Sequence, residues 1–518
     1  MRNFFLLLAL FPATLGLAQK KAKSPKKVKV EKIAASITEA ELKEHLYVIA
    51  GAEMEGRETA TEGQRKAASY IEQHFKSIGL LPGNNGTYQQ TFPVFRDSLI
   101  NASLTVNGKA FDLNKDFQPT LQLTRPGSQY FSEVVFAGHG IVDPDAGIDD
   151  YGSIDVKGKA VLLLDGAPSS YKTTKRGWRA PNGLYGKYNS AMSKGASAII
   201  IIGNGFPRQA LQPNGNMYTN LYADKQPASL FTVSTDLATA IVGESLKDLI
   251  ARGKDAAIAP AVFKANTMLE LQKKVSQLES TNVLGYIEGS DKKDEWLILT
   301  AHYDHLGKRG DVIYYGADDD GSGTVGIMEI AEAFAMARAG GNGPRRNVLV
   351  MAVSGEEKGL WGSEYFSENS PVPMDKVTAD LNIDMIGRVD TERKSADTLN
   401  YIYVVGDDKL STELKPISEM VNKKYVKLSL DYKYNDPADP NQIYFRSDHF
   451  NFARKGVPVI FYYDGMLQAD YHKPTDTPDK INYKLLKKRA DLVFYTAWEM
   501  ANRDSMIKRD LELPAMAR

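Results

Sequence analysis

The chain has 518 residues, of which 64 are acidic, 64 are basic and none is cysteine. This length predicts at least two folded units. The absence of cysteine excludes disulfides and thiolate zinc sites, and the acidic excess that remains beyond residue 32 argues against nucleic acid as a partner.

The first 18 residues have the layout of a cleaved secretory signal. Arg2 precedes an apolar run at residues 4–11, and small residues lead up to Ala18. An uncleaved membrane anchor is the alternative, but the run is short for a bilayer span. We predict a secreted or periplasmic protein with no integral membrane segment after signal removal.

We expect residues 19–37 to form a basic, flexible linker, because seven lysines and one glutamate fall between residues 20 and 32. Two amphipathic helices are expected after it. The first starts at Thr38, whose hydroxyl can cap it, and the second stops at Gly79.

Residues 116–266 contain short β-like runs such as "SEVVFAGHG", "GKAVLLLDG" and "ASAIIIIGNG", separated by Gly, Pro and Asp. This pattern of short apolar runs and turn residues predicts a compact, strand-rich module. We interpret it as an insertion into a discontinuous larger domain, which comprises residues 38–115 and 267–518.

Beyond residue 267, near-continuous apolar strands alternate with helical segments. This pattern predicts an α/β fold, with a mixed sheet covered by helices on both faces. Ligands of such sheets bind at the carboxyl ends of the strands, so polar residues at that edge are candidate site residues.

Several histidines and carboxylates do follow these strands. They are His302, Asp304, Asp318, Asp319, Asp320, Glu356, Glu357, Asp384, His472 and Asp476. Each alone could be a helix cap or a loop residue. Asp384 is different, because an aspartate next to an apolar strand is costly unless a positive charge neutralises it.

A divalent metal would supply that charge. Histidine and carboxylate without thiolate suit zinc, with Mn²⁺ or Co²⁺ as alternatives. So many ligand groups fit two ions that share a carboxylate better than a single ion. The chain has no HExxH motif, which excludes that helix-borne protease site.

Six segments resemble, in order, motifs of the M28 zinc peptidases, a family that includes bacterial aminopeptidases. They are "HYDH", "GADDDGSG", "SGEEKGLWGS", "NIDMIG", "RSDHFNFARKGVPVI" and "YHKPTDT". The resemblance extends from about residue 38 onward and implies a zinc exopeptidase-like fold. The insertion resembles the protease-associated (PA) domain of some members, which implies a strand-rich, α/β PA-like domain.

The resemblance implies two Zn²⁺ per chain. His302 and Asp384 would bind one ion, Glu357 and His472 the other, and Asp319 would bridge both. Glu356 would be the general base and acid that serves a metal-activated water and then the leaving amine.

The same resemblance suggests further roles. Asp304 would orient a ligand or its surroundings. Tyr471 would donate to the oxyanion or, alternatively, pack against the rim of the site. Arg446 would meet a polar group of the substrate or pair with Asp448.

The resemblance to M28 peptidases also implies a cis peptide bond between Asp319 and Asp320. Asp320 is expected at the start of the following helix, whereas Asp318 has no assigned partner. His305 and His449 are interpreted as surrounding structure.

These observations predict a secreted dinuclear zinc exopeptidase, and favour an aminopeptidase that acts on peptides or proteins. Carboxypeptidase or dipeptidase action and glutaminyl cyclisation are alternatives on the same scaffold, and a non-catalytic binding protein is another. The sequence leaves the oligomeric state open, a dimer included.

Overall fold

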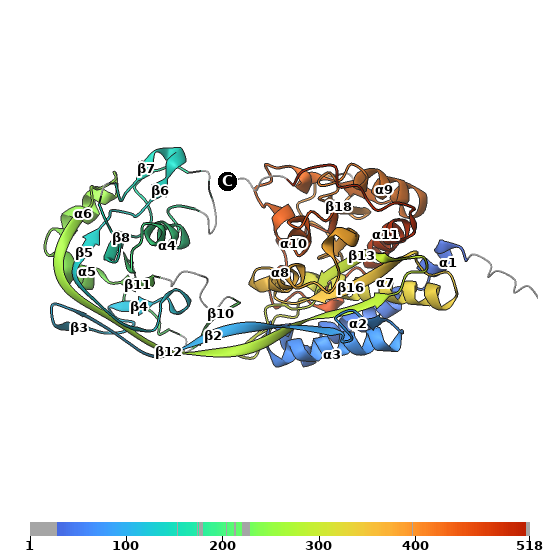
Figure 1. Cartoon of the computed structure of the whole chain (residues 1–518), viewed down its shortest axis with the longest axis horizontal. Coiled ribbons are helices and arrows are strands. Elements are labelled where there is room, and N and C mark those ends of the chain that lie inside the picture. The colour runs from blue at the N-terminus through green and yellow to red at the C-terminus, as the bar shows by residue number, and fades with distance from the viewer. Residues whose placement is uncertain are drawn as a thin grey trace, which may run out of the picture.

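The computed structural model describes residues 28–152, 154–173, 175, 180–203, 205–211, 214–219, 228–395 and 397–513. It has two parts, joined by a long pair of strands (Figure 1). None of the helices in these residues is long and apolar enough to cross a membrane. The predicted signal at residues 1–18 lies outside the described residues.

The C-terminal part is built on a mixed sheet with the strand order β19–β18–β20–β17–β13–β16–β12. These strands are β12 (Ala261–Ile287), β13 (Lys292–His302), β16 (Arg346–Val353), β17 (Val377–Ile383), β18 (Tyr401–Val405), β19 (Ser429–Asp431) and β20 (Val459–Tyr463). β13 runs parallel to β16 and β17, and β17 runs parallel to β20. The carboxyl ends of these four strands therefore share one edge.

Helices cover both faces of this sheet, as predicted. They are α2 (Glu39–Ile49), α3 (Glu62–Ser77), α7 (Gly323–Ala339) and α11 (Tyr483–Asn502) on one face, and α8 (Trp361–Glu368) and α10 (His449–Ala453) on the other. Leu297 and Leu299 of β13 pack in the first layer, whereas Ile298 packs in the second. This alternation follows from the two-residue period of a strand.

The second part has its own parallel strands and apolar layers. Its elements are β4 (Phe117–Pro119), β5 (Gly127–Phe136), β8 (Ala160–Leu164), β9 (Ala198–Ile202), β11 (Ser229–Val233), α4 (Leu184–Ser193), α5 (Thr235–Val242) and α6 (Leu246–Gly253). Helix α9 (Leu414–Val421) belongs to the C-terminal part. The remaining short strands of the molecule, which come from both parts, are β1 (Leu81–Pro82), β3 (Lys109–Phe111), β6 (Val142–Asp143), β7 (Ile148–Asp149), β10 (Asn214–Tyr218), β14 (Lys308–Arg309) and β15 (Val312–Ile313).

A long antiparallel pair joins the two parts: β2 (Gln89–Val106) and the 27-residue β12. β12 crosses the predicted boundary near residue 266 and makes the sheet continuous between the parts. The sequence prediction missed this pair. Its polar middle, such as "QKKVSQLES", lacks the apolar run or the clean alternation by which strands are recognised.

Part of the predicted linker is folded. Val30–Ala34 form helix α1, and Ile33, Ala34 and Ile37 are buried in the core near α7 and α11. The prediction of a flexible linker is therefore wrong for residues 30–37, where apolar side chains between the lysines find a surface to cover. The expected start of α2 is confirmed, because Thr38 Oγ1 accepts a hydrogen bond from the Glu41 amide at 3.1 Å.

Glu329 is a buried acid of α7 whose charge should make stability depend on pH. Burial, and then the nearby Glu41 and Glu332, raise its pKa to about 8. Its nearest ion-pair partner is His45, at 3.5 Å, and burial lowers the pKa of that histidine. Because the folded pKa of Glu329 exceeds the unfolded value, its contribution to stability is lost as pH rises from about 4.5 to about 8.

We therefore expect Glu329→Gln to stabilise the fold more at pH 8 than at pH 5. The difference between the two pH values should be roughly 3 kcal/mol in the free energy of unfolding, measured with urea. Glu39→Gln, at an exposed position of α2, is the control and should show no such difference. Equal effects of Glu329→Gln at both pH values would contradict the prediction.

Candidate metal centre

Polar side chains converge where the parallel strands end. His302 is the last residue of β13, and Glu357 lies in the short turn Glu356–Lys358 just after β16. Asp384 directly follows β17, and Asp319 lies in the loop that leads into α7. His472 comes from the segment after β20. The sheet thus gathers residues that are up to 170 positions apart in the sequence.

Asp319 stands between two histidines. Its Oδ1 lies 3.3 Å from His302 Nε2, and its Oδ2 lies 3.1 Å from His472 Nε2. His302 Nε2 is also 3.5 Å from Asp384 Oδ1, and His472 Nε2 is 3.1 Å from Glu357 Oε2. The five residues therefore form two groups, each with one histidine and one further acid, that share Asp319.

These separations match the ligand spacing of a tetrahedral metal. Two ligand atoms that are each 2.0–2.1 Å from a tetrahedral zinc lie about 3.3 Å apart. His302 Nε2 and Asp319 Oδ2 are buried and make no hydrogen bond with any described residue. Such unpaired buried groups are costly unless an ion binds them, so the donor set fits a metal pair.

His305 also touches this cluster, which its interpretation as surrounding structure did not anticipate. It is fully buried, and its Nδ1 lies 2.7 Å from Glu357 Oε1. Neither atom makes a hydrogen bond with any described residue, and His305 Nδ1 also lies 3.9 Å from Asp319 Oδ2. His305, Asp319 and Glu357 are thus a further group that could hold a metal ion, while His472 faces the other oxygen of the Glu357 carboxylate.

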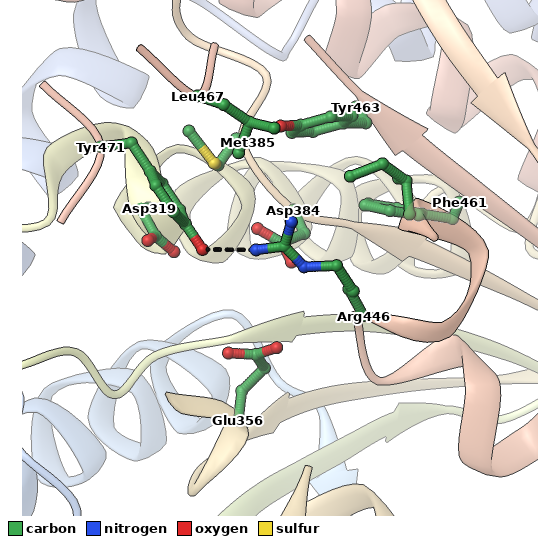
Figure 2. A pocket seen from close by; sticks show the side chains of 10 residues that line it. Asp319, Glu356, Asp384, Met385, Arg446, Phe461, Tyr463, Leu467 and Tyr471 are labelled. Carbon is green, nitrogen blue, oxygen red and sulfur yellow. Dashed lines mark hydrogen bonds between the residues drawn. The ribbon is translucent and has the colours of Figure 1, made fainter. Parts of the chain in front are cut away.

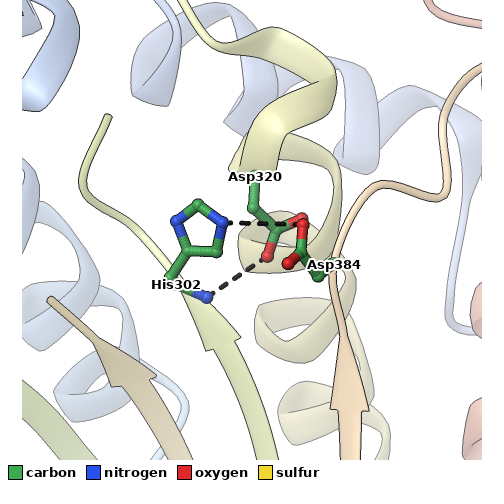
Figure 3. Close-up of side chains that lie close together, drawn as sticks. All are labelled: His302, Asp320 and Asp384. Carbon is green, nitrogen blue, oxygen red and sulfur yellow. Dashed lines mark hydrogen bonds and ion pairs between the residues drawn. The ribbon is translucent and has the colours of Figure 1, made fainter. Parts of the chain in front are cut away.

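Asp320 lies beside His302 and Asp384 but has other partners (Figure 3). Its Oδ1 accepts hydrogen bonds from the amides of Gly323 and Met385, both at 2.9 Å, and its Oδ2 accepts one from the amide of His302 at 3.2 Å. Both oxygens are thus used by backbone N–H groups. Asp320 caps the start of α7, as expected, and ties the ends of β13 and β17 together.

Asp318, which the sequence left unassigned, accepts a hydrogen bond from the amide of Gly387 at 2.8 Å. Burial, followed by Asp464 and Asp476 nearby, raises the pKa of Asp318 well above its usual value. Asp476 in turn accepts from the amides of Asp318 and Asp319, at distances of 3.0 to 3.2 Å. These contacts fix the loop that presents Asp319, and the expected cis peptide bond between Asp319 and Asp320 is present.

Asp304 connects two of the candidate residues. Its backbone carbonyl lies 3.1 Å from His302 Nδ1, and its Oδ1 accepts from the amide of Glu356 at 3.2 Å. The carboxylate is farther from the ring, at 3.8 Å from Nδ1. The carbonyl therefore fixes the orientation of the His302 ring, whereas the carboxylate holds the turn that carries Glu356.

A pocket opens beside the cluster (Figure 2). Glu356 enters it from one side, and Tyr471 and Arg446 enter from the other. Arg446 Nη2 donates to the Tyr471 hydroxyl at 3.1 Å. Both carboxylate oxygens of Asp448 lack a hydrogen bond with any described residue, so the suggested pair between Arg446 and Asp448 is not formed. Apolar side chains complete the lining: Met385, Ile443, Phe461, Tyr463 and Leu467.

The surroundings push the pKa values of neighbouring acids apart. Burial would raise the pKa of Asp319, but His302 and His472 outweigh it and hold that pKa well below its usual value. Burial raises the pKa of Glu356 well above its usual value, with His302 lowering that pKa and Asp384 and Glu357 raising it. Two nearby carboxyl groups with such different pKa values typically have different roles: one stays ionised and the other exchanges a proton.

Residues 282–497 match the sequence model of peptidase family M28. This part of the chain belongs to that family. The match contains all of the candidate residues named from the strand ends, and it begins within β12.

Curated relatives of the chain include a probable leucine aminopeptidase of Arthroderma otae, 30% identical over 216 residues. This alignment covers 40% of the chain and 55% of the relative. A probable zinc metalloprotease of Leptosphaeria maculans is 34% identical over 122 residues, which cover 23% of the chain and 27% of that relative. The chain thus spans about half or less of the length of these relatives.

Two solved structures share the fold beyond the M28 part. An aminopeptidase from Aneurinibacillus sp. strain AM-1 has a TM-score of 0.57 at 18% identity, over 94% of this chain and 99% of that one. BSAP, a zinc aminopeptidase from Bacillus subtilis, has a TM-score of 0.51 at 20% identity, over 92% and 99%. At these identities the likeness shows a common fold.

Two residues near the M28 site were missed by sequence reasoning. Arg57 and Thr59 precede α3 and are fully buried against the loops of the site. A signal was present in the stretch "EGRETATEG", where a glycine and an arginine precede the helix cap. Nothing in one sequence, however, relates that stretch to residues 250 positions away.

Proposed function

We propose that this protein is a secreted, dinuclear zinc aminopeptidase that releases N-terminal residues from peptides or proteins. The observation that carries the proposal is Asp319, whose two oxygens face His302 and His472 separately. One carboxylate between two histidine–acid groups is the arrangement that two neighbouring ions require.

His302 and Asp384 would hold one ion, and Glu357 and His472 the other, with Asp319 shared. The donor set of imidazole and carboxylate favours zinc, with Mn²⁺ or Co²⁺ as alternatives. The names of the zinc metalloprotease and zinc aminopeptidase relatives agree with this choice. When bound, zinc would act as a Lewis acid and make water a better nucleophile at neutral pH.

Glu356 is the general base and acid in this proposal. Its Oε2 lies 3.9 Å from His302 Nε2, at the mouth of the cluster and free of any assigned metal. The carboxylate would take a proton from the attacking water and deliver it to the leaving amine. Its raised pKa favours that second, acidic step, because a group that is protonated more readily holds the proton until the amine needs it.

Tyr471 and Arg446 would act on the opposite side of the pocket. The Tyr471 hydroxyl points into the pocket, where it could donate to the oxyanion that develops on the scissile carbonyl (Figure 2). Burial, and then Asp319, raise the pKa of this hydroxyl, so it stays protonated as a donor. Arg446 Nη2 binds the hydroxyl oxygen and leaves the hydroxyl proton available for the substrate.

The direction of action is inferred from the acids and from the relatives. A free N-terminal amine could be held by Glu356 and Asp384, which line the pocket together. The Arthroderma relative and both solved structures are named as aminopeptidases. Secretion rests on the signal-like residues 1–18.

We further propose that residues 116–266 form a PA-like domain. Support comes from the apolar layers on the two sides of β8 and β9, which are formed mainly by this part of the chain, with additions from β2 and β12 such as Leu104 and Leu269. Its role could be to recruit substrate or to limit access to the pocket, which lies in the other part of the molecule.

Blocked peptides test the direction of cleavage. Zinc-loaded protein should hydrolyse peptides with a free N-terminus and an amidated C-terminus. N-acetylated peptides of the same sequence should be cleaved at least about 100-fold more slowly, because the amine is a fixed part of recognition. Cleavage of N-acetylated but not of C-amidated peptides would overturn the aminopeptidase assignment and favour a carboxypeptidase.

A further inference from the structure

The segment Glu55–Ala60 packs against the loops of the metal centre although it lies outside the M28 match. Three of its residues that are not glycine have left-handed backbone: Glu55 (φ 48°), Arg57 (φ 51°) and Ala60 (φ 60°). Such conformations are unfavourable for these residues and persist where surrounding contacts impose them. The segment is therefore held in a specific shape by its neighbours.

Arg57 anchors the segment. Its fully buried guanidinium donates to the backbone carbonyls of Tyr303, Tyr315 and Gly316, at 2.7 to 2.9 Å, and to that of Ile49. Tyr303 follows His302, and Gly316 lies three residues before Asp319. One side chain therefore joins the two backbone stretches that present these histidine and aspartate residues.

Thr59 reaches Glu356 through a single intermediate. The Thr59 hydroxyl donates to Asp304 Oδ2 at 2.7 Å, and Asp304 Oδ1 accepts from the amide of Glu356 at 3.2 Å. Thr59 and Asp304 are both fully buried, so water does not compete for these bonds. The hydroxyl fixes the rotation of the Asp304 carboxylate and, with it, the position of the Glu356 backbone.

Glu58 holds the other end of the same turn. Its Oε1 lies 2.8 Å from Lys358 Nζ, with both side chains partly buried. The turn Glu356–Lys358 is thus attached at its first residue through Asp304 and at its last residue through Lys358. Both attachments start from consecutive residues of one segment.

We propose that Thr59 and Glu58 are positioning residues for Glu356, which act through Asp304 and Lys358. The proposal rests on the proposed function, since it assumes that Glu356 transfers protons. It assigns to the N-terminal segment a role in placing the base relative to the pocket, separate from the binding of metal by the five ligand residues.

Thr59→Val is the principal test, because valine keeps the shape of threonine and removes its hydroxyl. In zinc-loaded protein we expect kcat to fall about 10- to 100-fold, as for other partners that orient a reacting group, with KM and zinc content near the wild-type values. Thr59→Ser keeps the hydroxyl and should restore most of kcat. Thr61→Val is the matched control, because the Thr61 hydroxyl bonds, among the residues that the structure describes, only to the nearby Glu58 backbone carbonyl.

Hydrogen–deuterium exchange gives a second measurement that needs no activity. In Thr59→Val, the backbone of residues 354–360 should take up deuterium faster than in Thr59→Ser or Thr61→Val, because the bond from the Glu356 amide loosens. Glu58→Gln, at a less buried site, should act in the same direction and serves if Thr59→Val folds poorly.

Unchanged kcat and unchanged exchange in both Thr59→Val and Glu58→Gln would overturn the proposal. A fall in kcat that parallels loss of zinc would also overturn it, since the segment would then support the metal ligands instead. If the wild-type protein cleaves no peptide, the proposed function fails, and the exchange measurement still decides whether Thr59 positions the turn of Glu356.

Discussion

Glu356→Gln should lower kcat by about 10²- to 10⁴-fold while the protein keeps its zinc, the range typical for removal of a general acid or base. Glutamine has nearly the size of glutamate, but its amide cannot accept and return a proton. Glu356 lies at the pocket and outside both histidine–acid groups, so its loss should leave metal binding intact. Steady-state kinetics and zinc analysis of the same preparation test both halves of the expectation.

Glu368→Gln is the matched control, since Glu368 is exposed at the end of α8 and is not a candidate ligand. It should retain wild-type kcat and zinc content. Full activity of Glu356→Gln would remove Glu356 from the mechanism. If Glu356→Gln lost zinc together with activity, Glu356 would instead be a metal ligand, and Glu357 would become the candidate general base.

The strand ends were predictable because two local signals coincided there. Apolar runs such as "WLILTAH" and "TADLNID" marked buried strands, and the first polar residues after them marked the functional edge. His302 and Asp384 could be found in this way from the sequence alone. The choice of Asp319 among three neighbouring aspartates came from the resemblance, since local sequence does not distinguish them.

The geometry around the three aspartates explains why the sequence left them ambiguous. Asp318, Asp319 and Asp320 are all buried, and each has different partners. Asp318 and Asp320 accept hydrogen bonds from amides near residues 385 to 387, whereas Asp319 faces the histidines. These partners come from distant strands, so only the assembled sheet separates a candidate ligand from its two supports.

The N-terminal segment was unpredictable for the same reason. Arg57 satisfies backbone carbonyls, and a carbonyl leaves no trace in the side-chain sequence. The long strands β2 and β12 also escaped prediction, because their stability comes from pairing with each other across 160 residues. In both cases the decisive contacts are nonlocal and involve the backbone, which sequence periodicity does not report.

Asp319→Asn should reduce the bound zinc from two ions to one or none and should abolish most of the activity. Asparagine offers one oxygen acceptor, and its NH₂ group can only donate. The contacts of Asp319 with His302 and with His472 use different oxygens, so one of the two groups must lose its shared ligand. Zinc analysis after dialysis against a defined free zinc concentration measures the stoichiometry.

Thermal stability provides an independent measure of the loss of zinc binding in Asp319→Asn. At a free zinc concentration 100 times the dissociation constant, each site stabilises the folded state by about 2.7 kcal/mol. Asp319→Asn should lose the zinc stabilisation of at least one site. Its Tm should therefore rise less than the wild-type Tm when zinc is added to chelator-treated protein. Asp311→Asn, at an exposed position in the same region of the chain, should keep the full rise. If Asp319→Asn retained two ions and the wild-type rise in Tm, Asp319 could not be the shared ligand, and Asp320, the other acid beside His302 and Asp384, would become the candidate to test.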